Sequence, residues 1–318
     1  MGKIAITGGS GFIGSAIYKE CRKRCDEVVL FDKTEPPYKL PNGVTWTKCD
    51  VSDRDLVQKI MGQTKLDQLY LIAGVLGTSE LNVQPSVACN VNINGLANFM
   101  DLAVEHKLPR TFYVTKPNVW ENMYTITKEC SEKIIQFYMK EYGLEGVIHK
   151  WFNAYGPGQH THPVRKAVPY FILMALNNKP MRIHGDGKQT ADLIYVDDIA
   201  KVAVEAMHKP REQLTKTEVI EVGTGQGIVV NYLAESIRDM CHSKSEIIHE
   251  PMRSGETPNT QLAADTKKLF EIMGKDFKFT DYEEGMLRTI DYYRNLNPIQ
   301  TDVALQFYNG LDKSESCK

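Results

Sequence analysis

The first half of the chain alternates short apolar runs with longer stretches in which apolar residues recur every three or four positions. The short runs predict β-strands, and the longer stretches predict amphipathic helices. The predicted strands are residues 3–7, 27–31, 44–47, 68–72, 111–114 and 146–150. The predicted helices are residues 12–24, 53–61, 87–106 and 126–142. This alternation is typical of βαβ units, so we expect an α/β fold with a Rossmann-type, doubly wound parallel sheet.

After residue 155 the pattern becomes less regular. Helices are predicted at 166–176 and around 231–240, and short strands at 181–184 and 193–195. We therefore expect a first domain over residues 1–155 and a smaller C-terminal α/β lobe over 156–318. Segments near 190–223, with the apolar run 219–223, are expected to return to the first domain. The last dozen or so residues, which end in Lys313–Lys318, are predicted to be a frayed tail.

A glycine-rich segment, GGSGFIG, follows the first predicted strand and opens the first predicted helix. Gly8, Gly11 and Gly14 are spaced three apart. The first permits a tight turn, the second a close approach of the backbone to a diphosphate, and the third close packing of helix on strand. With Phe12 and Ile13 at the helix N-terminus, this segment predicts a dinucleotide site.

The ends of the next strands carry residues that fit the rest of a dinucleotide. Asp32 closes the second strand, 18 positions after Gly14, where a carboxylate can accept both ribose hydroxyls. A 2′-phosphate would be repelled there, so NAD is favoured over NADP, although Lys33 is adjacent. Asp50-Val51 after the third strand is expected near the adenine, and Ala73 after the fourth is expected to form a floor for the cofactor.

A tyrosine and a lysine stand one helical turn apart, at Tyr124 and Lys128. A free phenol has a pKa near 10 and is a poor base at neutral pH. A lysine one turn away, with the positive nicotinamide ring, is expected to lower that pKa. The resulting phenolate can take a hydroxyl proton while a hydride leaves for the cofactor. We therefore predict that this pair is catalytic and also contacts the cofactor.

Composition narrows the remaining possibilities. A formal net charge of -2 gives no reason to expect nucleic acid or an anionic membrane as a partner. No apolar stretch has the length of a membrane span or signal peptide, so a cytoplasmic protein is expected. The seven scattered cysteines indicate reduced thiols. We predict no metal, because His160 and His162 have no acidic or cysteine partner nearby in the sequence.

Several further motifs occur in the same order along the chain. They are Asn92-Ile93-Asn94-Gly95, YTITK at 124–128, Trp151-Phe152-Asn153-Ala154-Tyr155-Gly156-Pro157-Gly158-Gln159, GDGKQTADLIYVDD at 185–198 and Met252-Arg253-Ser254-Gly255-Glu256-Thr257. Together with the glycine turn, they make the chain resemble an extended short-chain dehydrogenase/reductase of the NAD-dependent epimerase/dehydratase family, which modifies nucleotide sugars. The resemblance covers nearly the whole length.

This resemblance implies a substrate, further site residues and a partner. The substrate would be a nucleotide-diphosphate sugar, with Asn153 near its sugar or phosphates and Arg253 on its diphosphate. A hydroxyl at the end of the fifth strand would hydrogen-bond the reacting sugar oxygen. The chain would also form a homodimer, in which helices 87–106 and 126–142 build a four-helix bundle.

The chain departs from the family pattern at three places. The segment 116–123 before the tyrosine is far shorter than usual. Counting from the fifth strand gives Thr115 as the third catalytic group, whereas counting back from Val119-Trp120 gives Lys116. We favour Thr115, because the chemistry requires a hydroxyl donor. Ala191 stands where an arginine usually precedes the aspartate, and Lys188, Arg165 or Lys166 are candidates to compensate.

These observations favour one reaction over several others. The set of Tyr124, Lys128 and Thr115 is sufficient for a nucleotide-sugar epimerase that forms a transient 4-keto sugar. A dehydratase of this family would carry Asp-Glu directly after its threonine, where this chain has Lys116 and Pro117. A dehydratase with relocated groups, a decarboxylase and a ketosugar reductase remain alternatives. A different class, a catalytically silent NAD-binding regulatory protein, also remains open.

Overall fold

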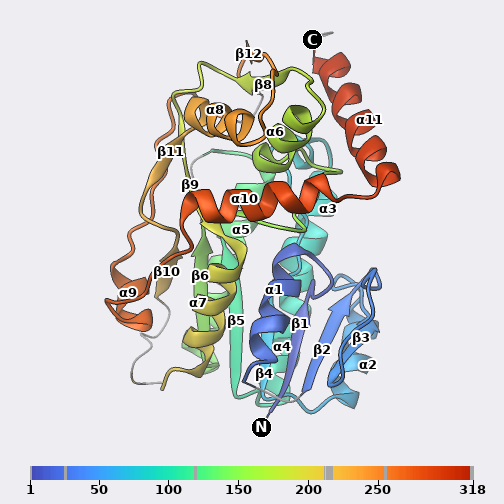
Figure 1. Cartoon of the computed structure of the whole chain (residues 1–318). Helices are drawn as coiled ribbons and strands as arrows, with labels where there is room; N and C mark the ends of the chain where they lie inside the picture. Colours follow the sequence, from blue (N-terminus) through green and yellow to red (C-terminus); the bar gives the residue numbers. More distant parts are fainter. Residues whose placement is uncertain are drawn as a thin grey trace.

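The computed structural model describes residues 2–24, 27–117, 120–210, 212, 218–253 and 256–315. Its larger part contains a seven-stranded sheet in the order β10-β6-β5-β4-β1-β2-β3, with every neighbouring pair parallel (Figure 1). The strands are β1 (Lys3–Thr7), β2 (Glu27–Asp32), β3 (Val44–Lys48), β4 (Gln68–Leu71), β5 (Arg110–Thr115), β6 (Gly146–Trp151) and β10 (Val219–Val222). The strand order reverses between β1 and β4, which is where a crevice opens at the carboxyl ends of the strands. The predicted Rossmann-type sheet is confirmed.

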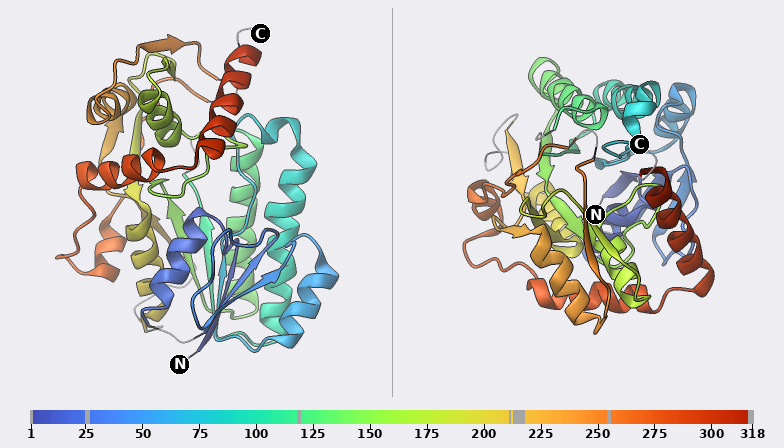
Figure 2. Two further views of the ribbon diagram at one scale, coloured as in Figure 1. Left: turned by 45° about the vertical axis from the view of Figure 1, so that its right-hand side comes forward. Right: turned by 90° about the horizontal axis from the view of Figure 1, so that it is seen from above.

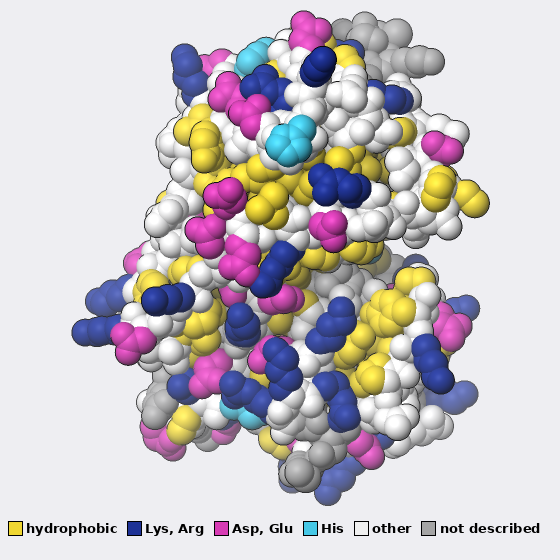
Figure 3. Space-filling view, viewed as in Figure 1, with side chains coloured by type: hydrophobic (Ala, Val, Ile, Leu, Met, Phe, Trp, Pro, Cys, Tyr) yellow, Lys and Arg dark blue, Asp and Glu magenta, His cyan; other side chains and the backbone are white. Residues whose placement is uncertain are grey.

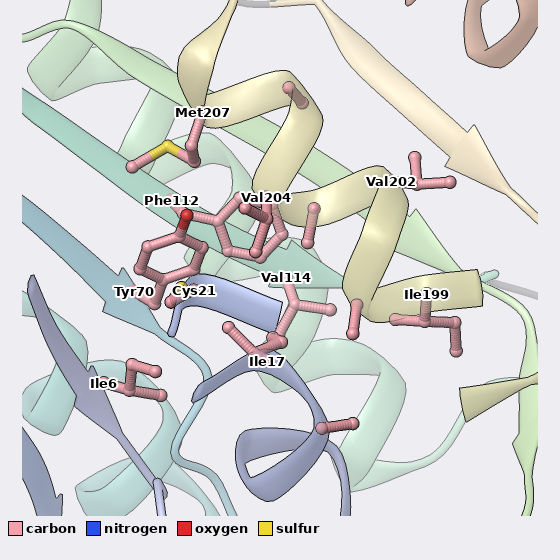
Figure 4. Close-up of a cluster of buried hydrophobic side chains, with 14 of the residues drawn as sticks. Ile6, Ile17, Cys21, Tyr70, Phe112, Val114, Ile199, Val202, Val204 and Met207 are labelled. Carbon is pink, nitrogen blue, oxygen red and sulfur yellow. The ribbon is translucent and has the colours of Figure 1, made fainter. Parts of the chain in front are cut away.

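Helices cover both faces of this sheet (Figure 2). One face carries α1 (Phe12–Cys21) and α7 (Val196–His208); the other carries α2 (Arg54–Gln63), α4 (Gly95–Glu105) and α5 (Met123–Glu141). Figure 4 shows the core beneath α1 and α7, where Tyr70 and Phe112 pack with ring centres 5.2 Å apart. Because α7 and β10 come from residues after 190, later segments complete this half of the molecule, while the exact domain division stays a prediction.

The long helix predicted over 87–106 is interrupted. It consists of α3 (Pro85–Cys89), the π-helical turn η2 (Asn90–Asn94) and α4, after the short 3-10 helix η1 (Leu81–Val83). A π-helical turn accommodates one extra residue and redirects side chains, and such turns are frequent at functional sites. Apolar periodicity predicted the helical stretch but not this interruption.

The smaller lobe contains two small sheets and several helices. The first sheet joins β7 (Asn153–Tyr155), β9 (Thr190–Tyr195) and β11 (Gly227–Val229), and the second joins β8 (Met181–His184) to β12 (Ile247–Glu250). The helices after β7, apart from α7, are α6 (Ala167–Leu176), α8 (Val230–Met240), α9 (Lys267–Met273), α10 (Tyr282–Arg294) and α11 (Pro298–Glu315). Of these, α9 packs with α7 on the large sheet, and the others share a separate core. Figure 3 shows a notch between the two lobes on the right of that face.

The expectation that the last dozen or so residues form a frayed tail is wrong as far as residue 315, because α11 continues to Glu315. Buried side chains at Ala304, Leu305 and Tyr308 anchor this helix on the lobe. Residues 316–318 lie outside the described part of the chain. Within the described residues, no helix is both long enough and apolar enough to cross a bilayer.

The helices expected to form a dimer carry exposed apolar side chains. Val87, Ile126, Phe137 and Tyr142 are all exposed in the single chain. A second copy would cover such side chains, but the homodimer stays a prediction.

Candidate active site

The glycine turn joins β1 to α1 through backbone contacts that exclude side chains. Gly8 has a φ of 68°, in the left-handed region that favours glycine, and its N–H donates to Phe31 O at 2.8 Å. A Cβ at Gly14 would collide with Gly8 O, and a Cβ at Gly11 would lie 3.2 Å from that oxygen. The turn therefore depends on having no side chain at Gly14 and leaves little room for one at Gly11.

The turn presents the N-terminus of α1 to the crevice. The cap residue, Gly11, has no side chain that could accept hydrogen bonds from the first turn of the helix. Phe12 and Ile13 pack their side chains against the core under α1, so they would offer a ligand their backbone N–H groups. Backbone donors at the positive end of a helix dipole fit a diphosphate, which agrees with a dinucleotide at this place.

Asp32 lies beside this turn at the end of β2. One carboxylate oxygen accepts from Ser10 N at 3.0 Å, and the other accepts from Thr34 N at 3.1 Å. Each oxygen keeps a second lone pair that can accept from a ribose hydroxyl. Lys33 is paired with Asp50 at 3.1 Å, so its charge is not left free to attract a 2′-phosphate. The arrangement fits NAD.

The remaining residues predicted on the cofactor side have different surroundings. Asp50 is held in the ion pair with Lys33. Val51 is buried and packs against Gly95, because a Cβ added to Gly95 would lie 2.7 Å from the Val51 side chain. Ala73 follows β4, and its N–H donates to the hydroxyl of Thr7 at 3.1 Å. Val51, Ala73 and Lys128 line one small cavity. Lys128 of α5 therefore lies near the carboxyl ends of β1 and β4.

Asn92 is a site residue whose role the sequence did not predict. It lies in η2, is buried, and accepts from Val75 N at 2.9 Å. Its amide nitrogen donates to Val75 O at 3.0 Å and to Thr127 Oγ1 at 3.1 Å. Asn92 therefore fixes the loop after β4 against the helix that carries Tyr124. The only sequence signal was its place in the Asn92–Gly95 motif.

Lys128 is buried beneath the crevice and is oriented by the main chain. Its Nζ donates to Val114 O at 3.0 Å and lies 5.2 Å from the centre of the Tyr113 ring. A Cβ added to Gly74 would lie 3.8 Å from Nζ, so the ammonium group reaches the loop after β4. Burial, and then the neighbouring Lys116, lower the pKa of Lys128 to about 8.

The acidity of Tyr124 differs from the sequence-based expectation. Tyr124 is half-buried in the first turn of α5, and burial raises the pKa of its phenol to about 12. Lys128 was expected to lower this pKa, but its ammonium group donates to Val114 O. Burial therefore favours the protonated phenol at neutral pH, and positive charge near the phenol favours its ionised form.

Two neighbouring residues at the end of β5 have opposite environments. The Thr115 side chain is buried, and its hydroxyl has no hydrogen-bond partner among the described residues. The Lys116 Nζ lies 5.4 Å from the centre of the Tyr124 ring and donates to Thr125 Oγ1 at 2.7 Å. Val119, from which the sequence argument counted back to Lys116, lies outside the described residues.

The residues expected to hold the substrate lie on the smaller lobe or at its border. Asn153 begins β7, is exposed, and donates to Asp192 O at 3.3 Å. Arg253 is part-exposed and forms an ion pair with Glu256. Burial lowers the pKa of Lys166, and the charges that also act on it are those of Glu80, Arg253 and Glu256, so Lys166 lies in the neighbourhood of the Arg253–Glu256 pair. Ser254 and Gly255 of the motif lie outside the described residues.

The candidates to compensate for Ala191 are not equivalent. Ala191 lies in β9 opposite Ile228 of β11. Lys188 is exposed and pairs with Asp186 at 3.4 Å, whereas Arg165 is buried, contacts His184 and lies 4.9 Å from the Tyr170 ring centre. The charge of Arg253 acts on Lys166, and it also acts on His184, which Arg165 contacts.

The expectation of no metal stays a prediction. Within the ranges that the structure describes, no group of three or more His, Cys, Asp and Glu side chains is arranged to hold an ion. His160 lies near the glycine turn, since a Cβ on Gly11 would be 4.0 Å from its Nε2.

Comparisons with known proteins show which sequences and folds this chain is similar to. The model of the NAD dependent epimerase/dehydratase family matches residues 4–223. The chain is 27% identical to a putative UDP-glucose 4-epimerase of Methanocaldococcus jannaschii, over 92% of this chain and 99% of the relative. It is 26% identical to the UDP-N-acetyl-alpha-D-glucosaminuronate decarboxylase of Bacillus cytotoxicus, over 92% of this chain and 97% of the relative.

Solved structures show the same fold. The UDP-glucose 4-epimerase of Thermotoga maritima, determined with UDP-glucose, superposes with a TM-score of 0.84 at 23% identity, over 92% of this chain and 98% of the other. The UDP-glucose 4-epimerase of Thermus thermophilus, determined with NAD, gives a TM-score of 0.83 at 21% identity, over 93% and 100%.

Proposed function

Since this chain belongs to the NAD-dependent epimerase/dehydratase family, we propose that it is a nucleotide-sugar epimerase that works through a transient 4-keto sugar. One observation carries the choice of reaction. At the end of β5, next to Tyr124, the chain has Lys116 and Pro117, and neither is a carboxylate. Elimination of water needs an acid and a base beside the tyrosine, whereas epimerisation needs only a reversible oxidation.

The cofactor side fits NAD, through the α1 N-terminus for the diphosphate and Asp32 for the ribose. When bound, NAD supplies a hydride acceptor that later returns the hydride. On the substrate side, Arg253 and Lys166 are the cations for the nucleotide diphosphate, and Asn153, which is exposed on β7, is the polar contact for the sugar or phosphates. In this proposal, the sugar on the diphosphate lies between the two sets.

The chain's own groups perform the proton transfer. Tyr124, once ionised, accepts the proton of the sugar hydroxyl, and Lys128 holds positive charge below the reacting centre. The third polar contact to the sugar comes from the end of β5, where Thr115 and Lys116 are the candidates. Return of the hydride to the other face of the ketone inverts the carbon.

The test is a panel of UDP-, dTDP-, GDP- and CDP-sugars, followed by mass spectrometry and proton NMR. Epimerisation gives unchanged mass with altered ring couplings. Tyr124→Phe is expected to lower kcat by about 10³-fold, because the base is lost. Tyr142→Phe, which removes an exposed phenol at the C-cap of the same helix, is the matched control and should retain activity.

Other outcomes would replace this proposal. Loss of water identifies a dehydratase, loss of carbon dioxide a decarboxylase, and gain of hydrogen with consumption of NADH a reductase. A protein that binds NAD but converts no sugar of the panel would be a silent regulatory relative. Full activity of Tyr124→Phe would remove the mechanism altogether.

A further inference from the structure

The end of β5 offers one polar side chain that is closed off and one that is accessible. Thr115 is 1% exposed, its backbone is paired with Lys150 of β6, and its buried hydroxyl has no partner among the described residues. A hydroxyl without accessible surface cannot donate to a sugar in the crevice unless β5 moves. The residue that follows it, Lys116, has left the sheet and remains part-exposed.

Lys116 is held in one orientation by two hydrogen bonds. Its Nζ donates to Thr125 Oγ1 and to Pro117 O, both at 2.7 Å. An ammonium group has three N–H bonds, so these contacts leave one for a ligand. The same Nζ lies 5.4 Å from the centre of the Tyr124 ring, so the ammonium group lies near the aromatic ring of the proposed base.

We propose that Lys116, and not Thr115, contacts the reacting sugar oxygen in this enzyme, and that its charge favours the ionised form of Tyr124. The inference deepens the proposed epimerase function and rests on it. A hydroxyl at this place would only share a hydrogen bond, whereas an ammonium group also brings a full positive charge toward a phenol that burial disfavours as an anion.

The charges around Lys116 allow this role. Glu129 of α5 supports the ammonium form, whereas Lys150 of β6 and Lys166 of the smaller lobe oppose it. Burial is the largest influence, and it lowers the pKa of Lys116 to about 8. Lys128 of α5 also senses this charge. With that pKa, most of the Lys116 population is protonated at neutral pH, so the donor and the charge are present together.

The reaction balances with Lys116 as a permanent donor. The sugar hydroxyl gives its proton to the Tyr124 phenolate oxygen, while its carbon–hydrogen bond breaks and the hydrogen leaves with both electrons to the nicotinamide ring of NAD. The sugar becomes a ketone and the nicotinamide is reduced. Lys116 keeps its three protons and holds the oxygen throughout. The reverse transfers, after the ketone turns over, regenerate phenolate and NAD.

The first experiment compares steady-state kinetics of three variants with the wild-type enzyme. Lys116→Met should lower kcat by about 10²-fold with little change in KM, because a donor to the reacting oxygen acts mainly in the transition state. Lys116→Arg should recover part of that loss. Lys140→Met, which removes an exposed lysine of α5, is the control for the loss of one positive charge. Wild-type kcat in Lys116→Met, or a comparable loss in Thr115→Val alone, overturns the proposal.

The second experiment needs no turnover. The phenol of Tyr124 is titrated in the NAD complex from the ultraviolet difference between each protein and its Tyr124→Phe counterpart. Lys116→Met should raise the pKa of this phenol by about one unit or more, and Lys116→Arg should restore it, because opposite charges within a few ångströms have effects of this size. An unchanged pKa in Lys116→Met overturns the electrostatic part.

The two experiments separate this inference from the proposed function. If the wild-type protein converts no nucleotide sugar, the epimerase proposal fails, while the titration still measures whether Lys116 acts on Tyr124. NAD binding and thermal unfolding are measured for each variant. If Lys116→Met does not fold, the charge-retaining Lys116→Arg and the neutral Lys116→Gln take its place in both experiments.

Discussion

The two sides of the crevice are built by different means. On the cofactor side, the groups that face a ligand belong mainly to the backbone, because three glycines bring β1 and α1 together and leave N–H groups at the helix N-terminus. On the substrate side, the proposed groups for the diphosphate are long cationic side chains, and one of them, Arg253, is paired with Glu256. Backbone geometry follows from where glycines stand, whereas the direction of a long side chain depends on its neighbours in space.

The largest effect that would test this contrast is expected at the glycine turn. In Gly14→Ala, the added methyl group would collide with Gly8 O, so the turn must shift. We expect a loss of about 3 kcal/mol in the free energy of unfolding and of about 10²-fold or more in NAD affinity. Urea unfolding and calorimetric NAD titration measure the two effects.

Gly62→Ala is the matched control for this change. Nothing lies within 4 Å of a Cβ added at Gly62, which is in the last turn of α2. The free energy of unfolding should therefore rise by about 0.5–1 kcal/mol, because alanine is the better helix residue. NAD affinity should stay the same. Wild-type NAD binding by Gly14→Ala would show that the cofactor side is not the rigid, backbone-built region described above.

A smaller effect is expected on the substrate side. Arg253→Ala removes one cation from the proposed diphosphate site but leaves Lys166 beside it. A charge-assisted hydrogen bond contributes about 1.5–3 kcal/mol, so KM for the nucleotide sugar should rise about 10- to 100-fold. NAD affinity should not change.

Lys188→Ala serves as the control for Arg253→Ala. Lys188 lies in the same lobe, is exposed and pairs with Asp186 at the surface. Its removal should leave KM nearly unchanged, because exposed ion pairs contribute little. Equal KM values for Arg253→Ala and the wild-type enzyme would show that the phosphates are held elsewhere.

The contrast between backbone geometry and side-chain direction also explains which features could be predicted from the sequence. The strand–helix alternation, the glycine spacing and the Tyr124–Lys128 spacing are local patterns, and the fold that they predict is confirmed. The direction of the Lys128 ammonium toward Val114 O is not local, because it depends on how β5 packs under α5. The raised pKa of Tyr124 follows from the same burial.

Three other features could not be predicted from local sequence patterns, because they depend on contacts between distant parts of the chain or on the exact end of a strand. The π-helical turn at Asn92 is stabilised by contacts with residues 17 and 35 positions away. Whether Thr115 or Lys116 faces the crevice depends on where β5 leaves the sheet, which a strand pattern locates only within a residue or two. The continuation of α11 to Glu315 depends on apolar contacts with the lobe.

The smallest effect concerns two histidines, one in each half of the molecule. His149 lies in β6, packs its ring 4.8 Å from the Phe112 ring centre, and has no partner for either nitrogen among the described residues. Burial lowers the pKa of His149 to about 3. In the smaller lobe, burial and then the positive charge of Arg165 lower the pKa of His184 to about 3. Burial alone lowers the pKa of His149, whereas a neighbouring cation contributes to the low pKa of His184.

The pH dependence of stability tests the effect of burial on His149. An unfolded histidine titrates near pH 6.5. Between about pH 6.5 and 3, His149 is therefore protonated in the unfolded chain and neutral in the folded chain. Stability contributed by the neutral ring is present above pH 6.5 and is lost as pH falls below it, by about 1 kcal/mol between pH 7 and 5.5. His149→Leu should remove that loss, as measured by urea unfolding at the two pH values, whereas replacement of the exposed His249 by leucine should not. An unchanged pH dependence in His149→Leu would mean that His149 gains a proton partner in solution and that the sheet half is less tightly closed than its core suggests.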